Sequence, residues 1–156
     1  MIASYESGTR TCNRTVPNPE GGRGMTVLVV DDIEPVASIL QEVLTQSGQT
    51  ASYALSGEEA LQLFNESEIE AVISDLEMPG MDGWELGRKI KEACTEQGIR
   101  KPAFILLTGW GEQAEDEDRM SSNGVDAVMA KPVNINKLLE LVRNTVDNES
   151  EPDMRQ

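Results

Sequence analysis

The sequence predicts an α/β domain in which a parallel sheet of five strands is covered by helices on both faces. Its 156 residues have the length of one ordinary domain. Five short apolar segments alternate along the chain with segments of helical periodicity, and the loops between them are short. Because crossovers between parallel strands are right-handed, this alternation places helices on both faces of one sheet.

The composition excludes several classes of protein. The chain has no histidine, and its two cysteines, Cys12 and Cys94, lie far apart. Zinc sites and His-dependent triads and dyads are therefore excluded, and a reducing, cytoplasmic location is expected. The apolar runs are too short for a transmembrane helix, and no secretory signal is expected. A formal net charge of −15 disfavours binding to nucleic acid or membranes and favours a divalent cation or a basic protein surface.

The chain divides into three parts. Residues 1–24 contain several Gly and Pro and no periodic apolar face, which predicts a disordered lead or linker. Residues 25–147 hold every predicted element and form the globular domain. Residues 148–156 are acidic and are predicted to be a frayed tail. We expect no output domain after the last helix.

The first strand, Thr26–Val30, is a continuous β-branched and aliphatic run, which is typical of a strand buried on both faces. A helix follows, with Pro35 in its first turn and Gly48 at its end. Its apolar residues recur at helical spacing and define the face that we expect to be buried. These residues are Val36, Ile39, Leu40, Val43 and Leu44.

The middle of the chain repeats this alternation twice. A strand over Thr50–Ala54 precedes a helix over 57–65 whose inward residues are Ala60, Leu61 and Phe64. A strand over 71–74 then ends at Asp75, and a Pro- and Gly-rich loop occupies 78–83. The third helix is marked by apolar residues at helical spacing, Leu86, Ile90 and Ala93.

Two further pairs complete the predicted fold. A strand over 103–107 ends at Thr108, and a helix is expected over 112–122. This fourth helix has a weak apolar face, Ala114 and Met120, which makes it a candidate for mobility. The fifth strand, 126–130, ends at Lys131-Pro132. The apolar face of the last helix consists of Ile135, Leu138, Leu139, Val142 and Val146.

Five polar residues follow the predicted strands directly, and they are Asp31, Asp32, Asp75, Thr108 and Lys131. Ligands of such sheets bind at the carboxyl ends of the strands, so we expect these side chains to meet at one site. Three carboxylates there would repel one another by roughly 4 kcal/mol per pair at ~4 Å and an effective dielectric near 20. A hard cation such as Mg²⁺ would offset this cost, because it prefers oxygen ligands.

A carboxylate beside Mg²⁺ can attack phosphorus and form an aspartyl phosphate. The Lys131 ammonium would then neutralise phosphoryl oxygens, and the Thr108 hydroxyl would donate a hydrogen bond to one of them. Positioning and charge stabilisation provide most of the catalysis in phosphoryl transfer. Taken singly, each of these residues could also have an ordinary structural role instead of a role in the site. Asp32 could be a helix cap, Asp75 a turn residue, Thr108 a cap and Lys131 a solvated charge.

Four motifs occur in order: VLVVDD at 27–32, VISDLEMPGMDG at 72–83, ILLTG at 105–109 and MAKPV at 129–133. With them the chain resembles, over about residues 25–146, the response regulator receiver domains of two-component signalling. The resemblance implies a flavodoxin-like, doubly wound (βα)5 fold with strand order 2-1-3-4-5. It also implies that Asp75 is the phosphoacceptor.

The resemblance further implies a ligand set for Mg²⁺. Asp32 and Asp75 would bind the ion directly, Asp31 would bind through water, and the backbone carbonyl of Glu77 would complete the protein's share. Thr108 and Lys131 would hold the phosphoryl group, next to a cis Lys131-Pro132 bond.

Four residues depart from the family pattern or have an ambiguous role. Receivers usually have an aromatic residue or His three positions before the Lys, where this chain has Val128, so the usual coupling of Thr108 to an aromatic rotamer is in doubt. Glu77 lies beside the expected path of attack, so the dephosphorylation rate is expected to be unusual, in a direction that the sequence does not give. Trp84 and Trp110 are either exposed partner contacts or loop anchors.

The resemblance implies a phosphorylation-activated switch in a phosphorelay. A histidine kinase or a histidine phosphotransfer protein would dock near the first helix and pass its phosphoryl group to Asp75. The added charge would alter the face formed by the fourth helix, the fifth strand and the fifth helix, and thereby the binding of a downstream protein. The domain would catalyse only its own phosphorylation and dephosphorylation, as a monomer or a weak phosphorylation-dependent dimer.

Several alternatives remain open. The chain is either a stand-alone receiver or the carboxyl-terminal receiver of a hybrid histidine kinase. The segment before Met25 and the motif LTGWG mildly favour the hybrid kinase. A rival is a small Mg²⁺-dependent phosphohydrolase similar to the haloacid dehalogenases. These carry Asp-x-Asp on the first strand, whereas Ile33 is the residue two after Asp31. A third possibility is a degenerate receiver that is not phosphorylated, which Val128 alone supports.

Overall fold

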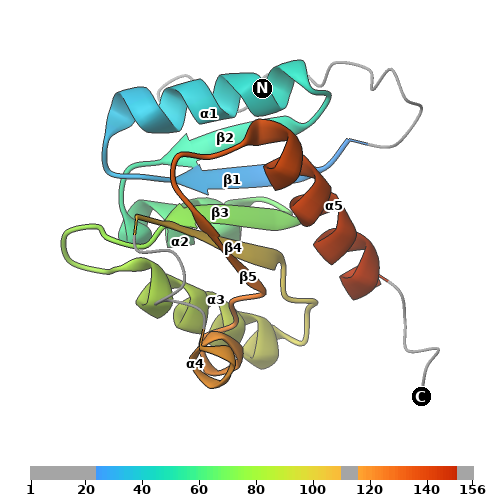
Figure 1. The fold of residues 1–156 in the computed structure, drawn as a ribbon. Coiled ribbons are helices and arrows are strands. Elements are labelled where there is room, and N and C mark those ends of the chain that lie inside the picture. Colours follow the sequence, from blue (N-terminus) through green and yellow to red (C-terminus); the bar gives the residue numbers. More distant parts are fainter. Residues whose placement is uncertain (1–23, 110–115, 151–156) are drawn as a thin grey trace.

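The computed structural model describes residues 24–109 and 116–150 and shows the predicted parallel sheet (Figure 1). Its five strands have the order β2-β1-β3-β4-β5, and every neighbouring pair is parallel. The strands are β1 (Thr26–Val30), β2 (Thr50–Ala54), β3 (Ala71–Asp75), β4 (Ala103–Thr108) and β5 (Ala127–Ala130). The helices are α1 (Glu34–Gln46), α2 (Gly57–Glu66), α3 (Gly83–Gln97), α4 (Glu117–Ser122) and α5 (Ile135–Ser150).

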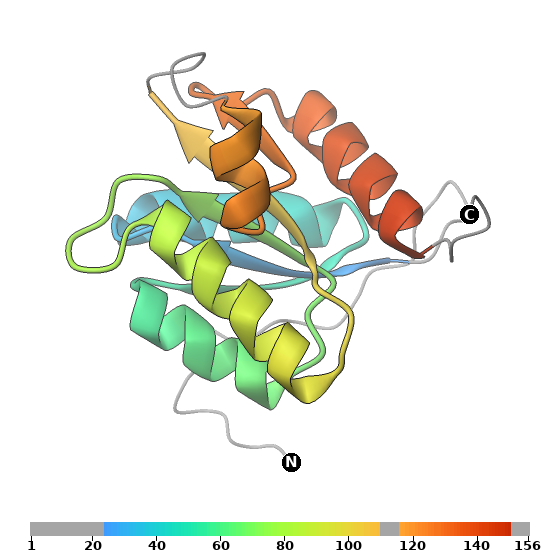
Figure 2. The same ribbon diagram turned by 90° about the horizontal axis from the view of Figure 1, so that it is seen from below.

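The helices form one layer on each face of the sheet, as the two views of the ribbon show (Figures 1 and 2). On one face, α1 and α5 pack on the strands, and on the other face α2 and α3 do so. Successive side chains of β1 point to opposite faces of the sheet. Val27 and Val29 pack in the layer of α1 and α5, and Leu28 and Val30 pack in the layer of α2 and α3. The sheet is therefore buried on both faces, which explains why its central strands lack polar alternation.

The buried face of α1 is narrower than its apolar pattern predicts. Ala37, Leu40 and Leu44 are buried, but Val36 is 43% exposed and Ile39 is 63% exposed. The expectation that these two residues face the core was wrong. A helix that packs on a flat sheet buries only the side chains directed at the strands, so the outer part of a wide apolar stripe remains in solvent.

Several element boundaries differ from those predicted. The helix α4 begins at Glu117, where Asp116 accepts hydrogen bonds from the backbone N–H groups of Asp118 and Arg119. Positions 112–115 of the predicted helix, including Ala114, lie outside the described residues. The strand β5 begins one residue late, because the Asp126 carboxylate accepts a hydrogen bond from the Phe104 N–H. At the other end, α5 continues to Ser150, past the start of the predicted tail.

Most of the expected core is present. Leu86 and Ile90 of α3 are buried, and so are Leu138, Val142 and Val146 of α5. In the described part of the chain, no helix is both long and apolar enough to cross a membrane.

Candidate functional site

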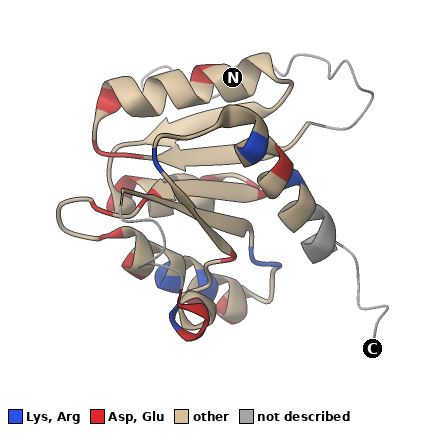
Figure 3. Cartoon of the chain, in the orientation of Figure 1, with Lys and Arg blue, Asp and Glu red and all other residues tan. Residues whose placement is uncertain are grey.

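The polar residues expected to meet lie at the carboxyl-terminal edge of the sheet. Asp31 follows β1 directly, Asp75 and Thr108 are the last residues of β3 and β4, and Lys131 follows β5. Figure 3 shows the acidic segments after β1 and β3 and the basic segment after β5 at this same edge. Because all five strands are parallel, residues some 100 positions apart in the chain become neighbours.

Three carboxylates form one cluster at this edge. Oxygen atoms of Asp31, Asp32 and Asp75 all lie within 4.8 Å of one another. Asp31 and Asp75 are 3% and 7% exposed, whereas Asp32 is exposed to solvent. A donor set made only of carboxylate oxygens, open on one side to water, fits Mg²⁺, which keeps several water ligands.

Asp32 does not cap α1. The residue at the N-cap is Ile33, whose side chain makes no capping hydrogen bond. The neighbouring Asp31 instead accepts a hydrogen bond from the Ile33 N–H through Oδ1 at 2.9 Å. Asp32 therefore has its carboxylate directed to the acidic cluster, and the interpretation of this residue as a simple helix cap is wrong.

The environment of Asp31 disfavours its charge. Burial raises the pKa of this carboxyl group above its ordinary value, and the charges of Asp75 and Asp32 raise it further. The hydrogen bond from the Ile33 N–H and the charge of Lys131 act in the opposite direction but do not outweigh these effects. A bound cation would relieve this unfavourable charge, in agreement with the donor set.

Lys131 supplies the positive charge of the site. Its Nζ lies 2.6 Å from Oδ1 of Asp75, and its backbone N–H donates to the carbonyl oxygen of Thr108 at 2.9 Å. The peptide bond between Lys131 and Pro132 is cis, as expected. Burial alone would lower the pKa of Lys131, but the hydrogen bond and charge of Asp75, with the charges of Asp31 and Glu77, raise it. The ammonium group therefore stays charged beside the acceptor carboxylate.

The backbone of Asp75 is fixed by the loop that follows it. The Gly83 N–H donates to the carbonyl oxygen of Leu76 at 2.9 Å, which closes the loop between β3 and α3. A side chain at Gly83 would place its Cβ 2.7 Å from the carbonyl oxygen of Asp75. Met78 and Met81 anchor the same loop in the core, as expected of packing residues. The glycine thus allows the first turn of α3 to lie against the acceptor residue.

The sequence reasoning did not single out Ser74. This residue is fully buried, and its hydroxyl donates a hydrogen bond to the carbonyl oxygen of Asp75 at 2.9 Å. It is the one polar side chain in the apolar run 71–74, which is a weak signal. Ser74 therefore contributes to holding the backbone of Asp75.

The remaining predicted residues occupy different positions relative to the cluster. Thr108 is 1% exposed at the end of β4. The Glu77 side chain is exposed on the loop after β3, and its suggested role as a carbonyl ligand stays a prediction. Val128 is partly buried and packs against the core on the α2 and α3 side. Trp84 is buried, so it is an anchor rather than an exposed contact, whereas Trp110 lies outside the described residues.

Comparison with known proteins identifies related sequences. The family model of the response regulator receiver domain matches residues 27–143. The virulence sensor protein BvgS of Bordetella pertussis is 35% identical over 123 residues, which are 78% of this chain and 10% of BvgS. The autoinducer 1 sensor kinase/phosphatase LuxN of Vibrio campbellii is 29% identical over 133 residues, 85% of this chain and 15% of LuxN. The chain thus spans only a small part of these relatives.

Solved structures of receiver domains have the same fold as this chain. The response regulator TrrA of Thermotoga maritima, in complex with Mg²⁺ and BeF, is 32% identical with a TM-score of 0.65, covering 78% of this chain and 98% of TrrA. The receiver domain of Ssk1 from Saccharomyces cerevisiae, crystallised with the phosphotransfer protein Ypd1, is a structural match with a TM-score of 0.73. That match is 22% identical and covers 85% of this chain and 95% of the matched chain.

Proposed function

Because the chain belongs to the response regulator receiver domain family and is a receiver of a two-component phosphorelay, we propose that Asp75 is its phosphoacceptor. The observation that carries this proposal is the position of the Asp75 carboxylate. Its oxygen lies within 4.8 Å of oxygens of Asp31 and Asp32, and the Lys131 ammonium lies 2.6 Å from its Oδ1. A carboxylate in this position would be close both to a cation held by the acidic cluster and to the positive charge that phosphoryl transfer requires.

We propose that Asp31, Asp32 and Asp75 hold Mg²⁺, with the carbonyl of Glu77 as a further ligand. When bound, the ion would neutralise negative charge on the transferring phosphoryl group. An Asp75 carboxylate oxygen forms the new bond to phosphorus while the bond from phosphorus to the donor histidine nitrogen breaks. The electron pair of the broken bond stays on that nitrogen, which then takes up a proton.

Lys131 and Thr108 would hold the product. The Lys131 ammonium is paired with Asp75 before transfer. After transfer it would pair with the negatively charged phosphoryl oxygens instead. The Thr108 hydroxyl, at the end of the neighbouring strand β4, would donate a hydrogen bond to one of them. The domain would thus catalyse its own phosphorylation and the later hydrolysis, but no turnover of an external substrate.

We propose that the donor is a phosphohistidine protein that docks on α1. Three aliphatic side chains are exposed in the segment that follows Asp32: Ile33 is 54% exposed, Val36 43% and Ile39 63%. Exposed aliphatic side chains on the helix that begins directly after the acidic cluster suit a partner that must bring its histidine to Asp75. The receiver domain of Ssk1 is bound by such a phosphotransfer protein.

Mass spectrometry of the intact protein tests the acceptor. After incubation with acetyl phosphate and Mg²⁺, we expect one phosphoryl adduct on the wild type and on Asp118→Asn, which changes an exposed aspartate of α4. We expect none on Asp75→Asn and none in the presence of EDTA. An adduct on Asp75→Asn would refute the assignment, and its absence from the wild type would favour a degenerate receiver. Steady turnover of a phosphomonoester would favour the phosphohydrolase.

A further inference from the structure

The short helix α4 is attached to α3 in different ways at its two ends. The helix has six residues, Glu117–Ser122, and none of them is buried. Met120 is partly buried against the core, and the other side chains are exposed. A helix with so little buried surface takes its position from a few specific contacts, so each of these contacts has a large effect on where it lies.

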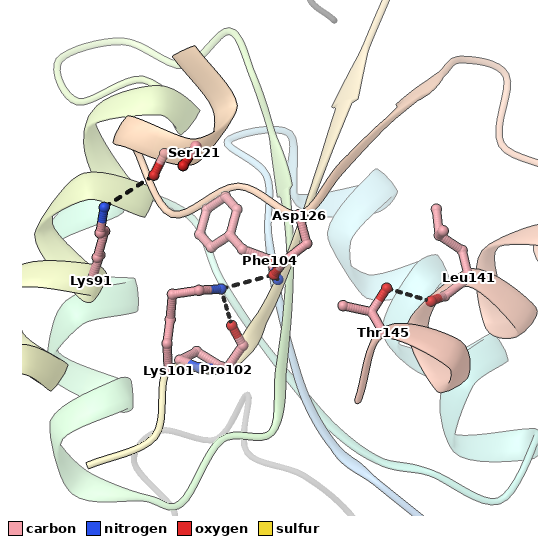
Figure 4. A network of polar contacts seen from close by, with 8 residues as sticks. All are labelled: Lys91, Lys101, Pro102, Phe104, Ser121, Asp126, Leu141 and Thr145. Carbon is pink, nitrogen blue, oxygen red and sulfur yellow. Dashed lines mark hydrogen bonds and ion pairs between the residues drawn. The ribbon is translucent and has the colours of Figure 1, made fainter. Parts of the chain in front are cut away.

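The carboxyl-terminal end of α4 is fixed by polar contacts and close packing (Figure 4). The Lys91 ammonium of α3 donates to the carbonyl oxygen of Ser121 at 3.0 Å. The backbone of Asn123 lies so close to Gly87 that a Cβ on this glycine would overlap the Asn123 carbonyl oxygen. Val125, which follows, is buried and donates its N–H to the carbonyl oxygen of Met120 at 2.8 Å. This end of the helix therefore stays in place.

The chain after α4 is tied to β4 as well (Figure 4). The Asp126 carboxylate accepts a hydrogen bond from the Phe104 N–H at 2.8 Å and pairs with the Lys101 ammonium at 2.8 Å. The same ammonium donates to the carbonyl oxygen of Pro102 at 2.7 Å. These contacts make the segment that leads into β5 a rigid support for the end of α4.

A different contact holds the side of α4 that faces the acceptor loop. The Arg119 guanidinium lies over the ring of Trp84, with its carbon 4.4 Å from the ring centroid. Trp84 is 6% exposed and belongs to the first turn of α3, whereas Arg119 is exposed. A cation stacked on an indole at an exposed site shifts a two-state equilibrium by roughly two- to fivefold. The contact is thus strong enough to influence the position of α4 and weak enough to break when the acceptor loop changes.

Trp84 is also joined to the acceptor residue. Gly83, its neighbour in the chain, approaches the Asp75 carbonyl oxygen closely and donates its N–H to Leu76. An open pocket of about 560 Å³ separates the loop after Asp75 from α4, and its lining includes Glu77, Trp84 and Arg119. A change in the loop therefore reaches Trp84 through the backbone, and the pocket leaves room for α4 to move.

We propose that the contact between Trp84 and Arg119 transmits the state of the acceptor loop to α4. This inference rests on the proposed function, since it takes phosphorylation of Asp75 as the event that changes the loop. The helix pivots about its fixed carboxyl-terminal end as Arg119 changes its position on the Trp84 ring. Trp84 is therefore the aromatic ring through which a change in the acceptor loop reaches α4.

Amide NMR with a phosphoryl mimic tests the coupling. Beryllofluoride with Mg²⁺ is added to the ¹⁵N-labelled wild type, to Arg119→Met and to Arg88→Met. The last variant is a matched control, because Arg88 also belongs to this region but pairs with Glu92 within α3. We expect the amides of Leu76 and Gly83 to shift in all three proteins. The amides of Arg119, Met120 and Ser121 should shift in the wild type and in Arg88→Met, and by less than about half as much in Arg119→Met.

The possible outcomes separate this inference from the proposed function. An α4 response in Arg119→Met equal to that of the wild type would overturn the inference. So would a wild type in which the site amides shift and those of α4 do not, although phosphorylation of Asp75 would then still stand. If the site amides do not shift in the wild type and acetyl phosphate gives no adduct, the proposed function fails, and the inference fails with it.

Discussion

Asp31 is buried next to two other carboxylates, and this position sets its behaviour. Its Oδ1 accepts a hydrogen bond from the Ile33 N–H, and burial together with its acidic neighbours raises its pKa. An asparagine would keep the hydrogen-bond acceptor and remove the charge. The same residue therefore destabilises the protein without a cation and stabilises the cation when it is bound.

We expect Asp31→Asn to raise the free energy of unfolding by about 1–2 kcal/mol without divalent cations, because the repulsion between Asp31 and its two acidic neighbours is removed. The same substitution should weaken Mg²⁺ binding at least about tenfold. Urea unfolding in EDTA and a Mg²⁺ titration followed by calorimetry measure the two effects. The control Asp118→Asn should change neither quantity, and a loss of stability in Asp31→Asn would contradict the prediction.

The raised pKa of Asp31 also predicts how stability depends on pH. Because this pKa is higher in the folded state than in the unfolded chain, the folded protein binds the proton more tightly. This contribution favours folding at acid pH and is lost as the pH rises through the raised pKa. In EDTA, the stability advantage of Asp31→Asn should therefore be smaller at an acidic pH than at neutral pH. Urea unfolding of both proteins at the two pH values measures it, and an unchanged difference would be evidence against it.

The first turn of α3 lies against the acceptor because its first residue has no side chain. In Gly83→Ala, the new Cβ would lie 2.5 Å from Cδ2 of Leu106 and 2.7 Å from the carbonyl oxygen of Asp75. We expect a loss of about 1–3 kcal/mol in stability and slower labelling by acetyl phosphate. In the control Gly109→Ala, the added Cβ meets no atom within 4 Å among the described residues, its chain neighbours aside, so stability should be unchanged. Thermal unfolding and the time course of the adduct test both statements.

The exposed part of α1 predicts that one substitution slows phosphoryl transfer from a protein donor but not from a small-molecule donor. Ile39→Ser should slow transfer from a phosphohistidine protein at least about fivefold, because an exposed aliphatic contact is lost. Labelling by acetyl phosphate should not change, because the acidic cluster consists of Asp31, Asp32 and Asp75 and does not include Ile39. A matched control is Ile99→Ser, since Ile99 is 48% exposed after α3. Equal slowing by both variants, or slowing of both reactions, would exclude a docking role for α1.

At the scale of the whole molecule, the excess of acidic residues predicts a specific response to Mg²⁺. The formal net charge is −15, so any salt should reduce self-repulsion to some extent. A cation that binds the folded state adds about 2.7 kcal/mol at a concentration one hundred times its Kd. We expect MgCl₂ to raise the Tm more than NaCl of equal ionic strength. Asp75→Asn should lose the difference, and a difference that persists in this variant would indicate binding elsewhere.

The order of the elements and the composition of the site follow from local features of the sequence. Continuous aliphatic runs such as Thr26–Val30 bury both faces of a strand, and helical spacing of apolar residues is a local property. Polar residues that directly follow strands must meet once the strands are parallel. For this reason Asp31, Asp75, Thr108 and Lys131 could be placed at one edge before any contact was known.

The burial of individual side chains within one apolar pattern, and the contacts between distant residues, depend on how the elements pack together. Val36 and Ile39 satisfy the helical period but lie outside the contact of α1 with the sheet. The support of Asp75 by Ser74 and Gly83, and the stacking of Arg119 on Trp84, join positions that no local pattern relates. Periodicity depends on neighbours in the chain, whereas these contacts depend on how closely whole elements approach one another in space.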